Sequence, residues 1–101
     1  MSYFMNDIRG ESVNAPNEAQ IREILSALQG ADGEHADVSL VHESGWSLSV
    51  YPEKVLIWEN VEYPSAPPRE FSLESWQEIF DVLLRVAQGD ISAVTRVAST
   101  G

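Results

Sequence analysis

Apolar residues recur every three or four positions in two stretches of the chain, which is the spacing of one face of an α-helix. In the first stretch, from Pro16 to Gln29, the apolar positions are Ile21, Ile24, Leu25 and Leu28. Asn14 is a candidate N-cap, Pro16 suits a first turn, and Gly30 suits the position after the last turn. The pattern predicts an amphipathic helix over 16–29.

The second helical stretch follows Ser72, a candidate N-cap, and ends at Gly89. Its polar residues fall mostly on one side, and the other side is a broad apolar face made of Trp76, Ile79, Phe80, Leu83, Leu84 and Ala87. This pattern predicts a second amphipathic helix. We expect Leu83 or Leu84, at its centre, to be fully buried.

Between the two helical stretches, apolar and polar residues alternate with the period of a β-strand. The runs 37–43 and 46–51 flank Ser44-Gly45, a tight-turn signal, and 55–63 is rich in β-branched and aromatic residues. These runs predict three antiparallel strands. Three weaker runs also fit strands: 3–8 as a short strand or a loose arm, 69–71 as a short edge strand, and 91–97 as a last strand.

Each predicted helix has one apolar stripe, which must cover a sheet or another helix. We therefore expect one α+β domain over residues 1–101, with an antiparallel sheet of three to five strands and two helices packed on one face. The other face is expected to be partly open to solvent. Alternation places Trp46 on the inward side with Leu48 and Val50, but it leaves the buried side of 55–63 open, so Trp58 fits either the core or an interface.

Charge narrows the range of partners. The chain has 16 acidic and 6 basic residues, giving a formal net charge of −10. Such a charge repels nucleic acid and anionic membranes and attracts basic proteins, although it also simply favours solubility. Between residues 31 and 63, Lys54 is the only basic residue, against the acidic residues Asp32, Glu34, Asp37, Glu43, Glu53, Glu59 and Glu62.

Residues that carry catalytic or metal chemistry are few. The chain has no Cys, and its two histidines, His35 and His42, lie in a turn-like stretch and at a strand end. The closest approach to a metal site is the group Asp32, Glu34, His35 and Asp37, whose order is not that of a calcium loop. The glycines are scattered singly and form no phosphate-binding loop. We therefore expect neither an enzyme nor a bound cofactor or metal.

The first residues, Met1 to Asp7, lack the basic and then apolar segments of a signal peptide. The apolar runs are all shorter than the roughly 20 residues that a membrane span needs. The absence of Cys fits a reducing compartment. The sequence therefore predicts a cytoplasmic protein.

Aromatic residues are interspersed among the acidic residues of the predicted sheet. Aromatic anchors surrounded by charges of one sign are typical of a protein-binding surface. The alternative is that the aromatic residues face the core while the acids solvate the other face. The candidate partner-binding residues are Glu43, Tyr51, Trp58, Glu59, Glu62 and Tyr63.

Three segments, 46–58, 69–80 and 86–90, together resemble the small immunity proteins of bacterial toxin systems, particularly the Imm1-like and contact-dependent inhibition groups. The similarity covers the C-terminal two-thirds of the chain. It implies stoichiometric inhibition of a cognate toxin domain, often a nuclease with a basic active-site cleft. The expected partner is thus a basic protein, not nucleic acid or membrane, and the free chain is expected to be a monomer. The alternative is a small acidic adaptor or secretion-chaperone-like module, which would dimerise through an apolar helix face.

Overall fold

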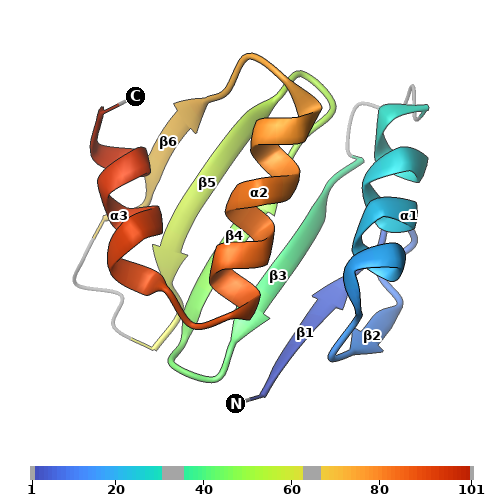
Figure 1. Ribbon diagram of the computed structural model, residues 1–101, viewed down its shortest axis with the longest axis horizontal. Helices are drawn as coiled ribbons and strands as arrows, with labels where there is room; N and C mark the ends of the chain where they lie inside the picture. Colours follow the sequence, from blue (N-terminus) through green and yellow to red (C-terminus); the bar gives the residue numbers. More distant parts are fainter. Residues whose placement is uncertain (1, 31–35, 63–66, 101) are drawn as a thin grey trace.

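The computed structural model describes residues 2–30, 36–62 and 67–100, which form one antiparallel sheet and three helices (Figure 1). The order of the strands in the sheet is β2-β1-β3-β4-β5-β6. Along the chain the elements are β1 (Tyr3–Asn6), β2 (Ser12–Asn14), α1 (Glu18–Gln29), β3 (Val38–His42), β4 (Trp46–Val50), β5 (Val55–Asn60), β6 (Arg69–Ser72), α2 (Trp76–Ala87) and α3 (Ile91–Thr100).

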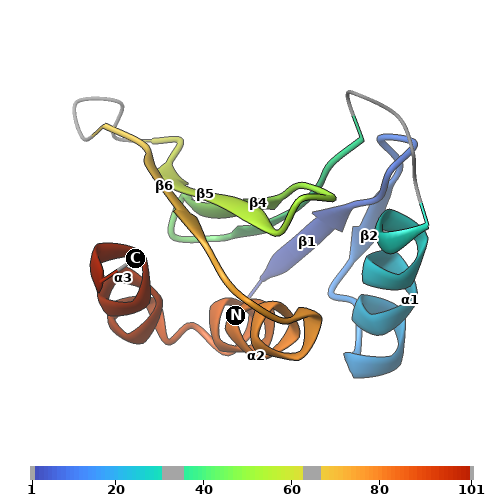
Figure 2. The same ribbon diagram turned by 90° about the horizontal axis from the view of Figure 1, so that it is seen from above.

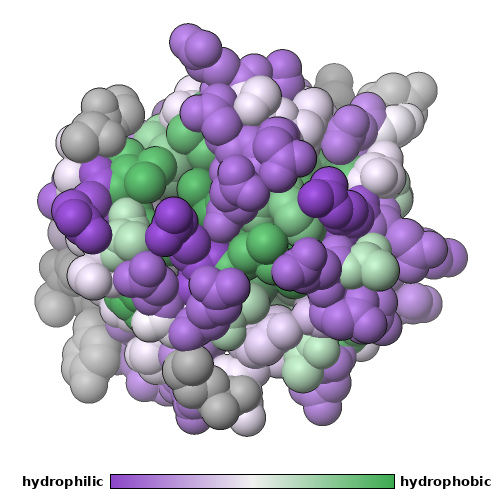
Figure 3. Space-filling view, in the orientation of Figure 1, coloured by the Kyte–Doolittle hydropathy of each residue, from purple (hydrophilic) through white to green (hydrophobic). Residues whose placement is uncertain are grey.

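The helices form a single layer on one side of the sheet (Figure 2). Helix α2 packs against β3, α1 contacts both β3 and α2, and α3 contacts β6 and α2. The outer surface of the helix layer is mostly hydrophilic, with smaller apolar areas showing between the helices (Figure 3). No helix covers the opposite face of the sheet (Figure 2). The α+β class and the placement of helices on one face agree with the sequence prediction.

The core lies between the sheet and the helices, and the strand register builds it. Met5, Leu40, Leu48 and Trp58 are successive partners across β1, β3, β4 and β5, and each is at most 1% exposed. This row faces the helices. Burying one large apolar side chain stabilises a fold by roughly 1.5–3 kcal/mol, so this row alone is a substantial part of the driving force for folding.

Trp58 therefore lies in the core, which is one of the two positions that the sequence left open for it. The sequence left its side of β5 undecided because Asn60, a polar residue, lies on the same side. Asn60 is buried but bonded: its Nδ2 donates to the carbonyl of Ser44 at 3.5 Å, and its Oδ1 accepts from the N–H of Glu62 at 2.9 Å. A satisfied amide is tolerated in the core, so the polar position does not mark the solvent side.

Both predicted helices exist, but the N-cap of each lies three residues after the predicted one. Asn17, not Asn14, caps α1, and Ser75, not Ser72, caps α2. Each cap forms a reciprocal capping box with the residue three positions later, Gln20 or Glu78. Asn14 and Ser72 instead end strands β2 and β6. The prediction for the middle of α2 is confirmed, since Leu83 is fully buried.

The counts of strands and helices differ from the prediction. The sheet has six strands because the three-residue β2, too short to leave a pattern, pairs with β1. Residues 91–97, predicted as a strand, belong to the third helix, α3. Val94 and Ala98, four residues apart, are its buried positions. Packing of this face overrides the β preference of its Ile, Val and Thr residues.

Within the described residues, none of the helices is both long enough and apolar enough to cross a membrane.

Candidate functional site

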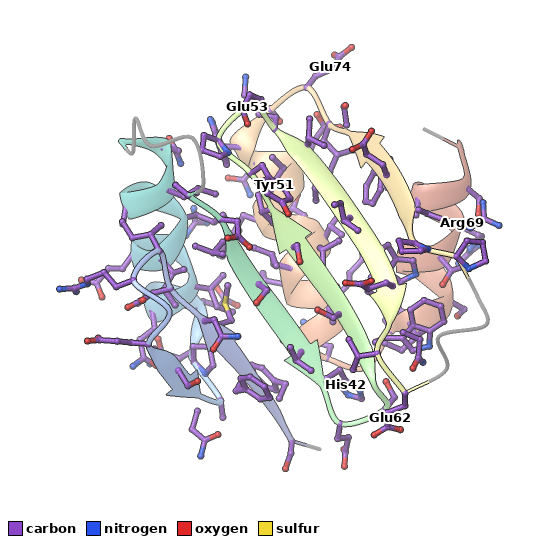
Figure 4. The ribbon with its side chains drawn as sticks, turned by 180° about the vertical axis from the view of Figure 1, so that it is seen from behind. His42, Tyr51, Glu53, Glu62, Arg69 and Glu74 are labelled. Carbon is purple, nitrogen blue, oxygen red and sulfur yellow. The ribbon has the colours of Figure 1, made fainter. Side chains whose placement is uncertain are left out.

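Figure 4 views the molecule from the face of the sheet that no helix covers. The register places Ser39 of β3, Ser49 of β4, Ile57 of β5 and Glu70 of β6 in one row across it. The next row contains Val41, Ser47 and Glu59 from β3, β4 and β5. Serine side chains are short, so the longer acidic side chains of β5 and β6 are the prominent charged groups beside the centre of this face.

The phenol of Tyr51 lies within the electrostatic influence of three carboxylates from different parts of the sheet. Burial raises the pKa of Tyr51 above its ordinary value of 10.0, and the negative charges of Asp37, Glu59 and Glu70 raise it further. A negative charge nearby disfavours the phenolate, so each carboxylate adds to the rise in the pKa of Tyr51 that burial causes. We call Asp37, Tyr51, Glu59 and Glu70 the acidic sheet face.

The local structure explains why Tyr51 and Asp37 lie at the same end of the sheet. Tyr51 follows β4 directly, and its N–H donates to the carbonyl of Val55 at 2.9 Å across the turn into β5. The turn is closed by the N–H of Lys54, which donates to the carbonyl of Tyr51 at 3.1 Å, and Lys54 has a positive φ of 64°. Asp37 directly precedes β3, the other neighbour of β4. Antiparallel pairing of β3 with β4 thus places Asp37 beside Tyr51.

The acidic sheet face is not neutralised internally. Within residues 2–30, 36–62 and 67–100, no basic side chain forms an ion pair with Asp37, Glu59 or Glu70. Carboxylates that lack a basic partner leave a negative electrostatic potential at this face of the sheet. The arrangement therefore favours binding of a positively charged surface.

Two other candidates, Glu43 and Glu62, lie at the opposite end of the sheet from Tyr51, which the labels of Tyr51 and Glu62 show in Figure 4. Both are exposed. The Glu43 Oε1 accepts from the N–H of Ser2 at 3.1 Å. The tight turn between β3 and β4 holds this end together, and Gly45 has a φ of 93° there. A Cβ at Gly45 would lie only 2.7 Å from the Asn60 Oδ1, so the close packing requires glycine.

The structure thus divides the six predicted interface residues. Tyr51 and Glu59 belong to the acidic sheet face, Glu43 and Glu62 lie at the far end, and Trp58 is in the core. Tyr63 lies outside the described residues. Sequence reasoning missed Asp37 and Glu70 as members of this surface. The pairing of the short edge strand β6 with β5 was the signal that could have placed Glu70 beside Ile57.

His42 is a buried residue at the end of β3. It is 6% exposed at the inward end of β3, where its Nδ1 accepts from the N–H of Ser44 at 3.1 Å and lies 2.8 Å from the Ser44 hydroxyl. In the described part of the chain, no three His, Asp or Glu side chains are grouped in a way that could hold a metal ion. Of the metal candidates, Asp32, Glu34 and His35 lie outside the described residues.

Comparison with known proteins adds no relative: no family model matches the chain, and neither a curated protein nor a solved structure is similar enough to count as a match.

Proposed function

We propose that this chain binds a basic protein domain through its acidic sheet face and neutralises it, as an immunity protein neutralises its toxin. One observation carries the proposal. Asp37, Glu59 and Glu70 act electrostatically on Tyr51 at the sheet face that no helix covers, and they have no basic partner among the described residues. The uncovered carboxylates complement a cationic protein surface, and Tyr51 supplies an aromatic anchor for the contact.

The chemistry of inhibition follows from charge. A nuclease binds the phosphates of its substrate with lysine and arginine side chains in its cleft. Carboxylates on a rigid sheet can pair with the same lysine and arginine side chains in place of the phosphates. The bound inhibitor then excludes the substrate both by its volume and by its charge. Charge complementarity also accelerates the encounter of the two proteins, which matters for an inhibitor that must act before damage occurs.

The alternative, a secretion-chaperone-like module, would bind and dimerise through an apolar helix face. Among the described residues, the large hydrophobic side chains that are strongly exposed are Ile8 and Val61, at 37% and 57%. Neither lies in a helix, and the outer helix surface in Figure 3 is mostly hydrophilic. These features give the alternative no specific support.

Co-expression tests the proposal. The product of the gene adjacent to the one that encodes this chain would be produced in cells with and without the chain. We expect the adjacent product to stop growth when produced alone, and the chain to restore growth and co-purify with it at a fixed ratio. An adjacent product that is harmless, or that stays toxic while the chain only raises its solubility, would favour a chaperone and contradict neutralisation.

A further inference from the structure

A cavity of about 220 Å³ lies at the end of the sheet, between β4, β5 and the last helix. Trp46 and Trp58 contribute its aromatic walls, Arg69 of β6 borders it, and Thr95 reaches it from α3. It is distinct from the acidic sheet face, because both tryptophans lie on the helix side of the sheet. Glu59 borders the cavity and also belongs to the acidic sheet face, so the two surfaces are continuous.

The two tryptophans differ in what the fold requires of them. Their rings stack, with centroids 4.7 Å apart and an interplanar angle of 13°. Trp58 is 1% exposed, and its Nε1–H donates to the Thr95 Oγ1 at 3.1 Å. Trp46 is only partly buried, and its indole N–H has no hydrogen-bond partner among the described residues. Trp46 therefore offers both an aromatic surface and a spare donor.

The volume of the cavity limits the size of the ligand that it can hold. An apolar cavity of roughly 150 Å³ binds benzene, whereas pockets for drug-sized ligands have volumes of roughly 300–1,000 Å³. A cavity of about 220 Å³ therefore suits a single aromatic ring with a small substituent. Aromatic rings attract one another through their edges and faces beyond the effect of the area that they bury.

The polar residues that line the cavity favour a ring substituent that accepts hydrogen bonds. Arg69 is exposed and forms no ion pair with any acidic side chain of the described residues. The Thr95 hydroxyl, which accepts from Trp58, still has its own hydrogen to donate. Arg69 and Thr95 are therefore two donor residues in the lining of the cavity, and a phenolic oxygen can accept from them.

We propose that this cavity binds the phenol ring of a tyrosine side chain on the protein partner. Only the source of the ring rests on the proposed function, because the fit of a phenol to the cavity is a property of this chain alone. Bound there, the tyrosine anchors the partner next to the acidic sheet face, and the buried ring and the charged contacts together form one interface.

The test uses the purified chain and p-cresol, the side-chain analogue of tyrosine, followed by the NMR signals of the tryptophan indole N–H groups. We expect a saturable shift of the Trp46 signal with p-cresol, and weaker binding of toluene, which lacks the hydroxyl. Arg69→Ala should weaken p-cresol binding several-fold. Arg9→Ala, which removes the same charge from an exposed turn away from the cavity, should leave binding unchanged.

Three results would overturn the assignment: no saturable shift, equal binding by the Arg69→Ala and Arg9→Ala variants, or tighter binding of benzamidine than of p-cresol. The last would mean that the Glu59 carboxylate, not the donors, selects the ligand. Because the experiment contains no partner, its result is independent of whether the chain neutralises the adjacent gene product. Saturable p-cresol binding without neutralisation would leave the cavity assigned and reject only the proposed function.

Discussion

Trp58 donates its indole N–H to the Thr95 hydroxyl across 3.1 Å, and this bond links β5 to α3. Replacing Thr95 by Val keeps the shape of the side chain but leaves the buried Trp58 donor without its acceptor. We expect the free energy of unfolding to fall by roughly 1–3 kcal/mol. Urea unfolding measures it, with Thr95→Ser as the control that keeps the acceptor. Equal stability of the Val and Ser variants would show that the hydrogen bond contributes nothing.

The N-cap of α2 gives a second stability prediction with an internal control. Ser75 accepts from the N–H of Glu78 at 3.2 Å, whereas Ser72 ends β6. Ser75→Ala should lower the free energy of unfolding by about 1 kcal/mol, and Ser72→Ala should change it little, because Ser72 is exposed on an edge strand. Thermal unfolding of the two variants compares them directly. A larger loss for Ser72→Ala would place the start of the helix where the sequence pattern first suggested it.

Titration of Tyr51 probes the acidic sheet face without a partner. Burial and the three carboxylates raise the pKa of its phenol above 10.0, so the folded chain holds this proton more tightly than the unfolded chain. The resulting contribution to stability is complete below pH 10 and is lost as the pH rises through the raised pKa. The difference in ultraviolet absorbance between wild type and Tyr51→Phe follows the ionisation. Asp37→Asn should move the pKa back toward 10.0, and a wild-type midpoint at or below 10.0 would contradict the described cluster.

Salt should slow association with the partner. If the uncompensated carboxylates steer a basic domain, screening must reduce the rate, because the Debye length falls from about 8 Å at physiological ionic strength to about 3 Å at 1 M. We expect the association rate constant, measured by stopped-flow fluorescence, to fall several-fold over this range. The dissociation rate should change less. A flat association rate would indicate an apolar interface instead.

The hydrophobic pattern predicted the α+β class, both long helices and the central strands because these elements bury one clear face each. It failed where the local signal was short or mixed. Strand β2 has three residues, and α3 contains β-branched residues whose helical face is defined only by packing against β6 and α2. The capping residues were misplaced because two capping-type residues stand near the start of each helix, and spacing alone does not choose between them.

The candidate site is formed by strand pairing, and the register of that pairing cannot be predicted from the sequence pattern alone. Glu59 and Tyr51 were identified from charge and alternation, but Asp37 and Glu70 join them only through the register of four strands. Trp58 was ambiguous because Asn60, on the same side of β5, is polar and yet buried through two hydrogen bonds. A local pattern cannot distinguish such a satisfied polar residue from a solvent-facing one.

Two triple variants with the same change in charge separate the acidic sheet face from the overall charge. The first neutralises the sheet face, and the second neutralises acids on the outer surface of helices α1 and α2, which lie on the other side of the molecule. The sheet variant is Asp37→Asn, Glu59→Gln and Glu70→Gln. The helix variant is Glu18→Gln, Glu23→Gln and Asp81→Asn. Circular dichroism checks that both fold.

The most direct measurement is the dissociation constant of each triple variant with the purified product of the adjacent gene, at physiological salt. A carboxylate desolvated opposite a cation contributes roughly 2 kcal/mol or more, which corresponds to a loss of about 30-fold in affinity. We expect the sheet variant to bind at least about 30-fold more weakly than wild type, and the helix variant to bind nearly as wild type. Wild-type affinity in the sheet variant, with weakened binding in the helix variant, would move the interface to the helices and contradict the account.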